Sequence, residues 1–209
     1  MPSVTRKNRS NRAQRRESVQ SELLGAVDRL LDDGESYTEL SVERLVAEAG
    51  ISRSTFYVYF EDKGDLLRAL AEDVIVEIGE AGRRWWDLPP DADKDDIREA
   101  LTEVFRTYRS HRAVFGAVVD TAAYDQGVRH QFGALVLGLI SELADHIRTG
   151  QQEGYVKQGL DPDRAAAWLT WMAERGLNQL VAPASPEESD RLVSTLTDIV
   201  WNTLYEGTR

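Results

Sequence analysis

Residues 40–67 read LSVERLVAEAGISRSTFYVYFEDKGDLL, and this stretch decides the fold of the N-terminal part of the chain. Ser41 is a good N-cap for a short helix over Val42–Ala49, and Gly50 can supply the positive φ that a tight turn needs. Ser52 can cap a second short helix that begins at the next residue. Two helices of about two turns joined by a glycine-containing turn predict a helix-turn-helix.

The two predicted helices have an apolar face and a polar face. The apolar residues expected to pack against one another are Leu45, Val46, Ala49, Phe56 and Phe60, with Ile51 filling the space at the turn. The side chains expected to be exposed on the second helix are Arg53, Ser54, Thr55, Tyr57 and Tyr59. These groups can donate hydrogen bonds to base edges or phosphates, and a major groove about 12 Å wide accepts a helix by its N-terminal end. The pattern favours DNA binding over the alternative, a set of solvated polar residues on an ordinary helical bundle.

The charge of the chain is unevenly distributed. The formal net charge is −11, but the residues before Glu17 include no acidic residue and six basic ones, which are Arg6, Lys7, Arg9, Arg12, Arg15 and Arg16. A positive end on a negative body is expected when only that end meets phosphate. We therefore predict a flexible basic arm over residues 1–16; the alternative is a disordered, solubilising tail.

Composition excludes several classes of protein. The chain has 209 residues, of which 42% are hydrophobic, and it contains no Cys, so disulfides and thiolate metal sites are impossible. No apolar stretch approaches the roughly 20 residues that a membrane span requires, and no apolar run follows the basic N-terminus. We expect a cytoplasmic protein without a membrane partner.

The rest of the chain shows helical periodicity. Apolar stripes at helical spacing run through residues 23–31, 67–81, 97–108 and 128–147, and Pro89-Pro90 interrupts the chain between the second and third. Asp161-Pro162 and Ser185-Pro186 each predict a helix start, with the last two helices at about 162–181 and 186–206. No segment alternates with period two. We predict an all-α protein of about nine helices, with a three-helix DNA-binding domain over 17–68 and a helical bundle over 69–209.

The quoted stretch resembles the TetR (tetracycline repressor) family of regulators. The resemblance rests on Ser41, Ala49-Gly50-Ile51-Ser52, Thr55-Phe56-Tyr57-Val58-Tyr59-Phe60, Lys63 and Leu66-Leu67. It implies that Thr55, Tyr57, Tyr59 and Lys63 hold phosphate. It also implies that Arg53 and Ser54 contact bases, and that Ser41 and Arg44 clamp the opposite backbone. Ser52 is expected to belong to the same DNA-binding set. Two residues depart from what DNA binding in this family favours. Gly64 replaces a residue that favours helix. Glu43 places a carboxylate on the DNA side, where it would repel phosphate unless it pairs with Arg44 or accepts a hydrogen bond from a cytosine amine.

The C-terminal part resembles the ethionamide-activation repressor branch of that family. The resemblance rests on FRTYRSHR at 105–112 and WMAER at 171–175. It implies an apolar ligand pocket lined by Leu101, Phe105, Phe132, Val136, Leu139, Thr170, Trp171, Met172 and Ala173. The alternative is an aromatic stripe that forms filled core. Thr170 and Ala173 replace asparagines of that branch, so the identity of the ligand does not transfer, and Glu174-Arg175 is expected to be structural.

These expectations combine into a ligand-responsive repressor. The resemblance implies a homodimer through the last two helices, a palindromic double-stranded DNA operator and release by a small apolar effector. An enzyme is disfavoured because His111, His130 and His146 lack metal-ligand spacing and no phosphate loop or nucleophile motif is present; we expect no cofactor, metal or catalytic residue. A DNA-bound structural or division-site factor on the same fold, or a transcriptional activator, stay open as alternatives.

Overall fold

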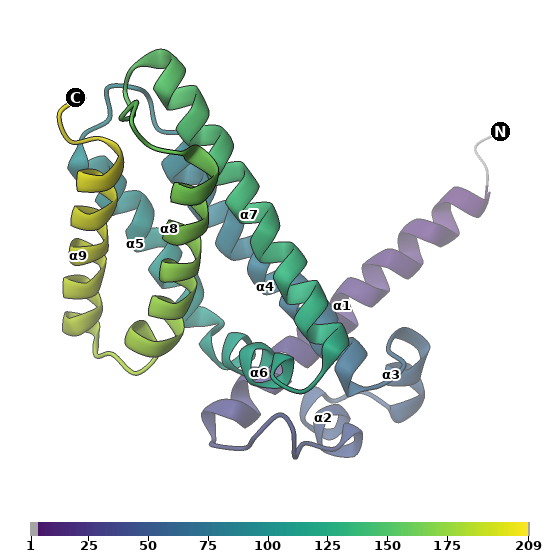
Figure 1. Ribbon diagram of the computed structural model, residues 1–209. Helices are drawn as coiled ribbons and strands as arrows, with labels where there is room; N and C mark the ends of the chain where they lie inside the picture. The colour runs from purple at the N-terminus through teal and green to yellow at the C-terminus, as the bar shows by residue number, and fades with distance from the viewer. Residues whose placement is uncertain (1–3, 209) are drawn as a thin grey trace. The chain divides into compact units, whose positions relative to one another are not determined.

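The computed structural model describes residues 4–208, with side-chain exposures from residue 14 onward. Within these residues the chain is helical without any strand, as predicted (Figure 1). The nine α-helices in that range are α1 (Val4–Asp32), α2 (Val42–Ala49), α3 (Arg53–Tyr59), α4 (Lys63–Trp86), α5 (Lys94–Ser110), α6 (Arg112–Ala122), α7 (Gln126–Glu153), α8 (Pro162–Gly176) and α9 (Pro186–Leu204). No helix among the described residues has both the length and the apolar character needed to cross a membrane.

The helices group into two compact units. The first contains residues up to Asp73 together with Ala113–Phe132, and the second contains Val74–Arg112 together with the residues from Gly133 onward. The first unit thus includes α6 and the first turns of α7, so each unit is discontinuous in sequence. The division into an arm over 1–16, a DNA-binding domain over 17–68 and a bundle over 69–209 stays a prediction.

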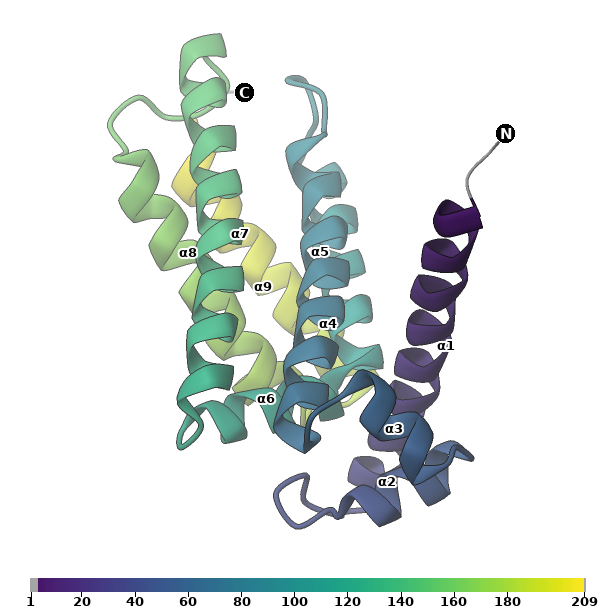
Figure 2. The same ribbon diagram turned by 90° about the vertical axis from the view of Figure 1, so that its right-hand side faces the viewer.

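The helix-turn-helix forms from local signals, as the sequence predicted (Figure 2). The Ser41 hydroxyl accepts a hydrogen bond from the Arg44 amide at 3.1 Å and begins α2. Gly50 has a φ of 70° and ends α2, and its position lets the Ile51 amide donate to the Val46 carbonyl at 3.0 Å. The Ser52 hydroxyl accepts from the Thr55 amide at 3.0 Å and begins α3. Each N-cap of this kind stabilises a helix by about 1 kcal/mol.

A continuous apolar core holds α3 in the first unit. Phe56 and Phe60 are buried with their ring centroids 5.5 Å apart, which confirms that they are core residues. The other fully buried side chains around them come from α1, α2 and α4: Leu23, Val27, Leu45, Leu66 and Leu67. The Gln20 amide of α1 also donates to the Asp73 carboxylate of α4 at 2.6 Å. The short recognition helix is therefore fixed by packing rather than by its own propensity.

Helix α1 is longer than the sequence suggested. Its backbone begins at Val4, so residues 4–16, which we assigned to a basic arm, continue the same helix that carries the apolar stripe farther on. Arginine, lysine, glutamine and alanine all favour helix, so an apolar face is not required for these residues to extend one. The flexibility of residues 1–16 stays a prediction.

The second unit is tied together by a buried polar contact at one end. The Tyr205 hydroxyl accepts a hydrogen bond from the Trp85 indole at 2.8 Å and lies 2.8 Å from Nε2 of His146. All three side chains are buried, and they come from α4, α7 and the residue that follows α9. This arrangement gives His146 a structural role.

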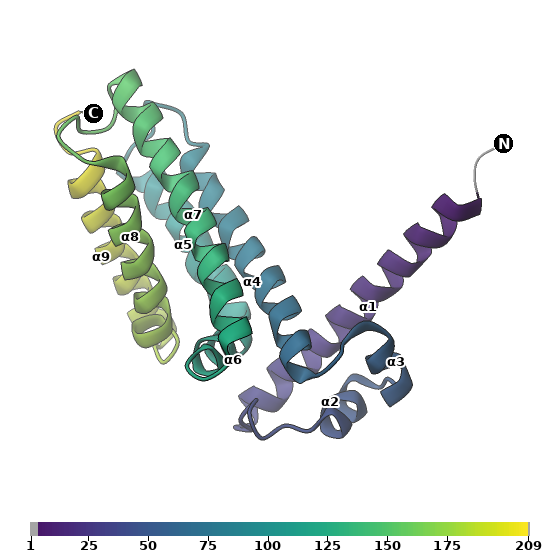
Figure 3. The ribbon, with the colours of Figure 1, turned by 45° about the vertical axis from the view of Figure 1, so that its right-hand side comes forward.

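The end of α8 departs from the prediction of one helix over 162–181. Helix α8 ends at Gly176, and residues Leu177–Val181 form a π-helical turn before α9. Figures 1 and 3 show α8 and α9 side by side and antiparallel. None of the predicted apolar stripes covers helix α6, although the described residues contain the predicted total of about nine helices.

Candidate DNA-binding site

Helix α3 presents a polar face to solvent. Arg53, Ser54 and Tyr57 are exposed, whereas Thr55 and Tyr59 are half-buried against the rest of the unit. The face is not uniformly polar, because Val58 is also exposed. The five predicted contact residues of α3 are therefore brought together on one short helix, and all of them keep at least partial access to solvent.

The hydroxyls at the start of α3 form a small cluster. The Ser52 Oγ atom lies 2.7 Å from the Ser54 Oγ atom and 2.8 Å from the Thr55 Oγ1 atom, while it caps the Thr55 amide. Ser52 is thus occupied as a cap and orients the other two hydroxyls. Ser54 and Thr55 can exchange these contacts for a phosphate or a base edge, since a hydroxyl rotates to suit its partner.

Arg44 is shared between two carboxylates. Its guanidinium forms ion pairs with Glu35 at 3.0 Å and with Glu48 at 3.3 Å. The hydrogen bond with Glu35 is the main reason that the pKa of Arg44 is raised. Glu48 also pairs with Arg29 at 2.8 Å, and the hydrogen bond from Arg29 is the main reason that the pKa of Glu48 is lowered. Arg44 therefore offers phosphate little uncompensated charge.

Arg53 is held in the same manner by a different acid. It forms an ion pair with Glu43 of α2, and its guanidinium carbon lies 5.8 Å from the centre of the Tyr57 ring. Glu43 was expected to pair with its neighbour Arg44 or to read DNA directly. The pair with Arg53 forms instead because the turn brings the start of α2 beside the start of α3.

Lys63 has an intramolecular role that the sequence did not reveal. Its ammonium group donates to three backbone carbonyls of the segment between α1 and α2, at 3.4 Å to Tyr37, at 3.1 Å to Leu40 and to Thr38. The buried Tyr37 hydroxyl donates in return to the Lys63 carbonyl, and burial raises the pKa of Tyr37. Three donors are all that an ammonium has, so in this arrangement Lys63 positions the domain and has no N–H directed at phosphate.

We expect Lys63→Met to destabilise the DNA-binding unit and to weaken DNA binding by that route. Removing the ammonium leaves three carbonyls without their charged donor. A hydrogen bond from a charged group contributes about 1.5–3 kcal/mol to the free energy of unfolding. Tyr37→Phe, which keeps every charge, should lower operator affinity in the same direction with an unchanged salt slope. Urea unfolding and operator titrations at two salt concentrations measure both effects. A Lys63→Met protein of normal stability with a salt slope flattened by about one unit would restore the phosphate role.

Gly64, the second departure from the family pattern, lies in a crowded place. A Cβ added there would lie 3.1 Å from the Asp62 carboxylate, 3.5 Å from the Arg68 guanidinium and 3.7 Å from the Asp125 carboxylate. The absence of a side chain leaves room for these charged groups, which offsets the lower helix propensity of glycine.

The helix-turn-helix itself is acidic. Residues 34–68 contain four basic residues against seven acidic ones, whereas the residues before Glu17 contain six basic and no acidic ones. Arg44, Arg53 and Lys63 already have intramolecular partners, and the largest local excess of basic over acidic residues in the sequence lies before Glu17. The acidic partners of Arg44 and Arg53 were not predicted, although the i, i+4 spacing of Arg44 and Glu48 is a signal for an ion pair in the sequence.

The structure does not bring all of the predicted pocket residues together. Phe105, Met172 and Ala173 line a cavity of about 120 Å³ between α5, α8, the π-helical turn and α9. Leu101 and Val136 are buried, and Leu139 and Thr170 are half-buried, but none of these four lines that cavity. Phe132 belongs to the first unit, where its ring packs on Phe115 with centroids 5.9 Å apart. Trp171 is exposed.

Glu174 follows the cavity-lining residue Ala173 in the chain. It is half-buried and burial raises its pKa, whereas Arg175 is exposed.

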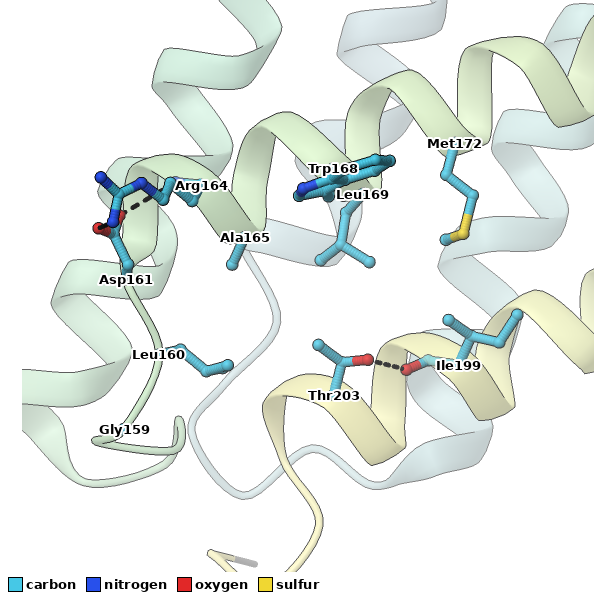
Figure 4. Close-up of a pocket in the computed structure, with 10 residues that line it drawn as sticks. All are labelled: Gly159, Leu160, Asp161, Arg164, Ala165, Trp168, Leu169, Met172, Ile199 and Thr203. Atoms are coloured by element: carbon cyan, nitrogen blue, oxygen red, sulfur yellow. Dashed lines mark hydrogen bonds and ion pairs between the residues drawn. The ribbon is translucent and has the colours of Figure 1, made fainter.

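A second hollow adjoins this cavity and shares Met172 and Ile199 with it. It has a volume of about 390 Å³ and is lined by residues of α8, of α9 and of the segment before α8 (Figure 4). Trp168 is 79% exposed at its edge, and Met172 and Ile199 are exposed beside it. Leu180, in the π-helical turn, is also exposed. Large apolar side chains rarely gather on the surface of a soluble monomer without a partner.

Comparison with known proteins matches two separate parts of the chain. Residues 34–70 match the family described as "Bacterial regulatory proteins, tetR family", and residues 97–206, more than half of the chain, match "Transcriptional regulator EthR, C-terminal domain". The HTH-type transcriptional regulator EthR of Mycobacterium tuberculosis is 29% identical over 189 residues, which cover 90% of this chain and 87% of that protein. The EthR of Mycolicibacterium smegmatis is 27% identical over 206 residues, covering 97% and 94%.

Solved structures share the fold at lower identity. The fatty acid degradation regulator FadR from Bacillus halodurans is similar with a TM-score of 0.71 and 16% identity, covering 93% of this chain and 96% of that one. The TetR family transcriptional regulator PfmR from Thermus thermophilus has a TM-score of 0.68 and 18% identity, covering 87% and 97%. The relatives with matching sequences are transcriptional regulators, and the two family matches include both α3 and the helices around the cavity. The chain therefore belongs to the TetR family of DNA-binding bacterial regulators, with a C-terminal domain of the EthR type.

Proposed function

We propose that this protein is a dimeric repressor that binds a palindromic operator and is released by a small apolar effector. The observation that carries the proposal is the pairing of an exposed, capped helix α3 with a C-terminal bundle that has a partly open apolar cavity and an exposed apolar face. One part reads DNA, another binds a small molecule, and the apolar face joins two copies.

In this proposal the N-terminal end of α3 enters the major groove. Arg53 and Ser54 face the base edges, while Thr55, Tyr57 and Tyr59 contact phosphates. Ser41 is occupied as the cap of α2 and Arg44 by its two carboxylates, so their contacts with the opposite backbone require a change of partner. The basic segment before Glu17 supplies most of the phosphate attraction.

The proposed dimer is formed by α8 and α9. Trp168, Met172 and Ile199 place large apolar groups on adjoining surfaces of these helices, and Leu180 extends them into the π-helical turn. A second copy is the occupant that the function needs, because one short recognition helix reads too few base pairs for a useful specificity ratio.

The proposed effector enters the cavity beside Phe105 and Ala173. Its lining is almost wholly apolar, which favours an apolar ligand, but its volume of about 120 Å³ is below the 300 Å³ or more that drug-sized ligands occupy. Ligand binding therefore requires side chains to move, and the flexible Met172 is suited to this. A relative from Bacillus subtilis, 24% identical over 141 residues, is named a fatty acid metabolism regulator, so acyl compounds are the first ligands to test.

We expect ligands that raise the melting temperature to lower operator affinity by about 5- to 150-fold, the usual range of allosteric coupling. Gly176→Leu should abolish this response without changing operator affinity in the absence of ligand, because a Cβ at Gly176 meets open space and the position lines the cavity. Gly138→Leu is the matched control, since Gly138 is an exposed, equally open helical glycine that does not line the cavity. Thermal-shift screening followed by operator titration measures both steps.

The proposal fails if stabilising ligands leave operator affinity untouched. Mapping the chromosomal sites of the protein separates it from the other candidates. A repressor is supported if the protein occupies a few promoter sites and expression from those promoters rises when the protein is deleted. A fall in expression after deletion indicates an activator, and many scattered sites indicate a structural factor.

A further inference from the structure

We propose that Glu43 is a specificity-determining residue, which holds the Arg53 guanidinium for a base edge and reduces its attraction to phosphate. The inference rests on the proposed operator binding by α3. It assigns a role to an acidic residue that otherwise opposes DNA binding, since a carboxylate on this face repels the phosphate backbone.

The geometry supports a held guanidinium rather than a freely moving one. Glu43 lies in the first turn of α2 and Arg53 is the first residue of α3, so two helices whose caps and core fix them in place present the two groups to each other. The Tyr57 ring, one turn farther along α3, lies 5.8 Å from the guanidinium carbon. Arg53 thus has two contacts that restrict its rotamers before any DNA is present.

The pair remains accessible to a duplex. The Arg53 side chain is 58% exposed and that of Glu43 is 55% exposed. Arginine has five N–H donors in a planar fork, so a carboxylate on one part of the fork leaves other donors available. Guanine presents two acceptors, N7 and O6, on its major-groove edge, and a bidentate contact from arginine is the commonest specific contact with it.

Charge compensation explains why Glu43 would favour bases over phosphates. A phosphate attracts arginine through net charge, and the neighbouring carboxylate cancels much of that attraction. A base edge is neutral, so binding to it depends on correctly placed N–H donors. The ion pair with Glu43 keeps the donors of Arg53 in place. Because Arg44 is already paired with Glu35 and Glu48, Glu43 is not divided between two arginines. The same acid therefore lowers non-specific binding and orders the base-reading group.

The test compares Glu43→Gln with Glu39→Gln in the full-length protein. Glu39 is exposed in the segment before α2 and forms no ion pair within the described residues, so this control removes the same charge from a position four residues earlier without breaking an ion pair. Binding is titrated on the operator, on operators changed at each base pair of both half-sites, and on unrelated duplex DNA, at two salt concentrations. We expect Glu43→Gln to lose about 5- to 100-fold discrimination between the correct and a changed base pair at one position of each half-site. The variant should also bind unrelated DNA more tightly, and its slope of log affinity against log salt should steepen by about one unit per protomer.

Two further variants make the outcome specific. Glu43→Asp keeps the charge but shortens the side chain, so it should lose discrimination with an unchanged salt slope. Arg53→Ala should lose preference at the same base pair, and adding Glu43→Gln to it should cause no further loss there. Melting temperatures of all variants exclude a general loss of folding, and Glu43→Asp gives the readout if Glu43→Gln fails to fold.

The inference is overturned if Glu43→Gln retains full discrimination, if it behaves as Glu39→Gln does, or if Arg53→Ala affects a different base pair. These results would leave the proposed repressor intact, because the wild-type protein would still select its operator. A wild-type protein without sequence-selective duplex binding would instead end the proposed function.

Discussion

Replacing both Trp168 and Ile199 with glutamate is expected to leave the protein as a single chain and to lower its operator affinity about a thousandfold or more. Both side chains are exposed on the surface that the dimer would bury, with Trp168 79% exposed and Ile199 40% exposed. Burying a large apolar side chain stabilises by about 1.5–3 kcal/mol, and an unpaired carboxylate buried in its place is strongly unfavourable.

The loss of affinity follows from the two-fold symmetry of the proposed complex. A dimer adds the contacts of two recognition helices on half-sites one helical turn or more apart, whereas a monomer retains the contacts of one. Sedimentation and light scattering measure the assembly, and fluorescence anisotropy measures operator affinity. Leu137→Glu on α7 is the matched control, because Leu137 is 61% exposed in the same unit but does not line the hollow between α8 and α9. A double variant that remains a dimer would contradict the assigned interface.

Neutralising the basic N-terminal segment is expected to lower operator affinity on the order of a hundredfold at physiological salt. The variant replaces the first five basic residues with glutamine, namely Arg6, Lys7, Arg9, Arg12 and Arg15. Each phosphate contact contributes about 0.9 to the slope of log affinity against log salt, so five lost contacts flatten the slope by up to about 4 to 5 per protomer. Glutamine favours helix nearly as well as arginine, which keeps the backbone of α1 intact.

Arg16 is left unchanged in this variant for a structural reason. Its guanidinium carbon lies 6.0 Å from the centre of the Phe60 ring, so it belongs to the folded unit. The control is replacement of Arg84 and Arg106, which are exposed on α4 and α5 in the second unit, and it should leave the salt slope unchanged. Unchanged operator affinity after neutralising the segment would return residues 1–16 to the alternative of a solubilising tail.

The features predicted successfully from sequence are those that depend on neighbouring residues. Ser41, Gly50 and Ser52 act through bonds to residues one turn away, and the structure contains all three contacts. The prolines after Asp161 and Ser185 likewise mark the starts of α8 and α9. Phe56 and Phe60 were identified as core because the helical period places them opposite the polar residues of α3.

The partners of the charged residues could not be read in this way. Lys63 was assigned to phosphate, yet its ammonium contacts carbonyls 23 to 26 residues earlier in the chain. Glu43 pairs with Arg53 rather than with the adjacent Arg44. Long, flexible side chains can reach many partners, and the partner that is reached depends on which helices approach.

The sequence by itself determined the all-α class, the positions of the capped helices and membership of a family, because capping, turn geometry and apolar period are local properties. The tertiary structure alone decided that residues 113–132 belong to the N-terminal unit. It also decided that only three of the predicted pocket residues line the cavity of about 120 Å³, and which acids pair with the arginines of the DNA-binding face. These depend on the approach of segments distant in sequence, and side-chain reach and close packing settle them only when the helices are in place.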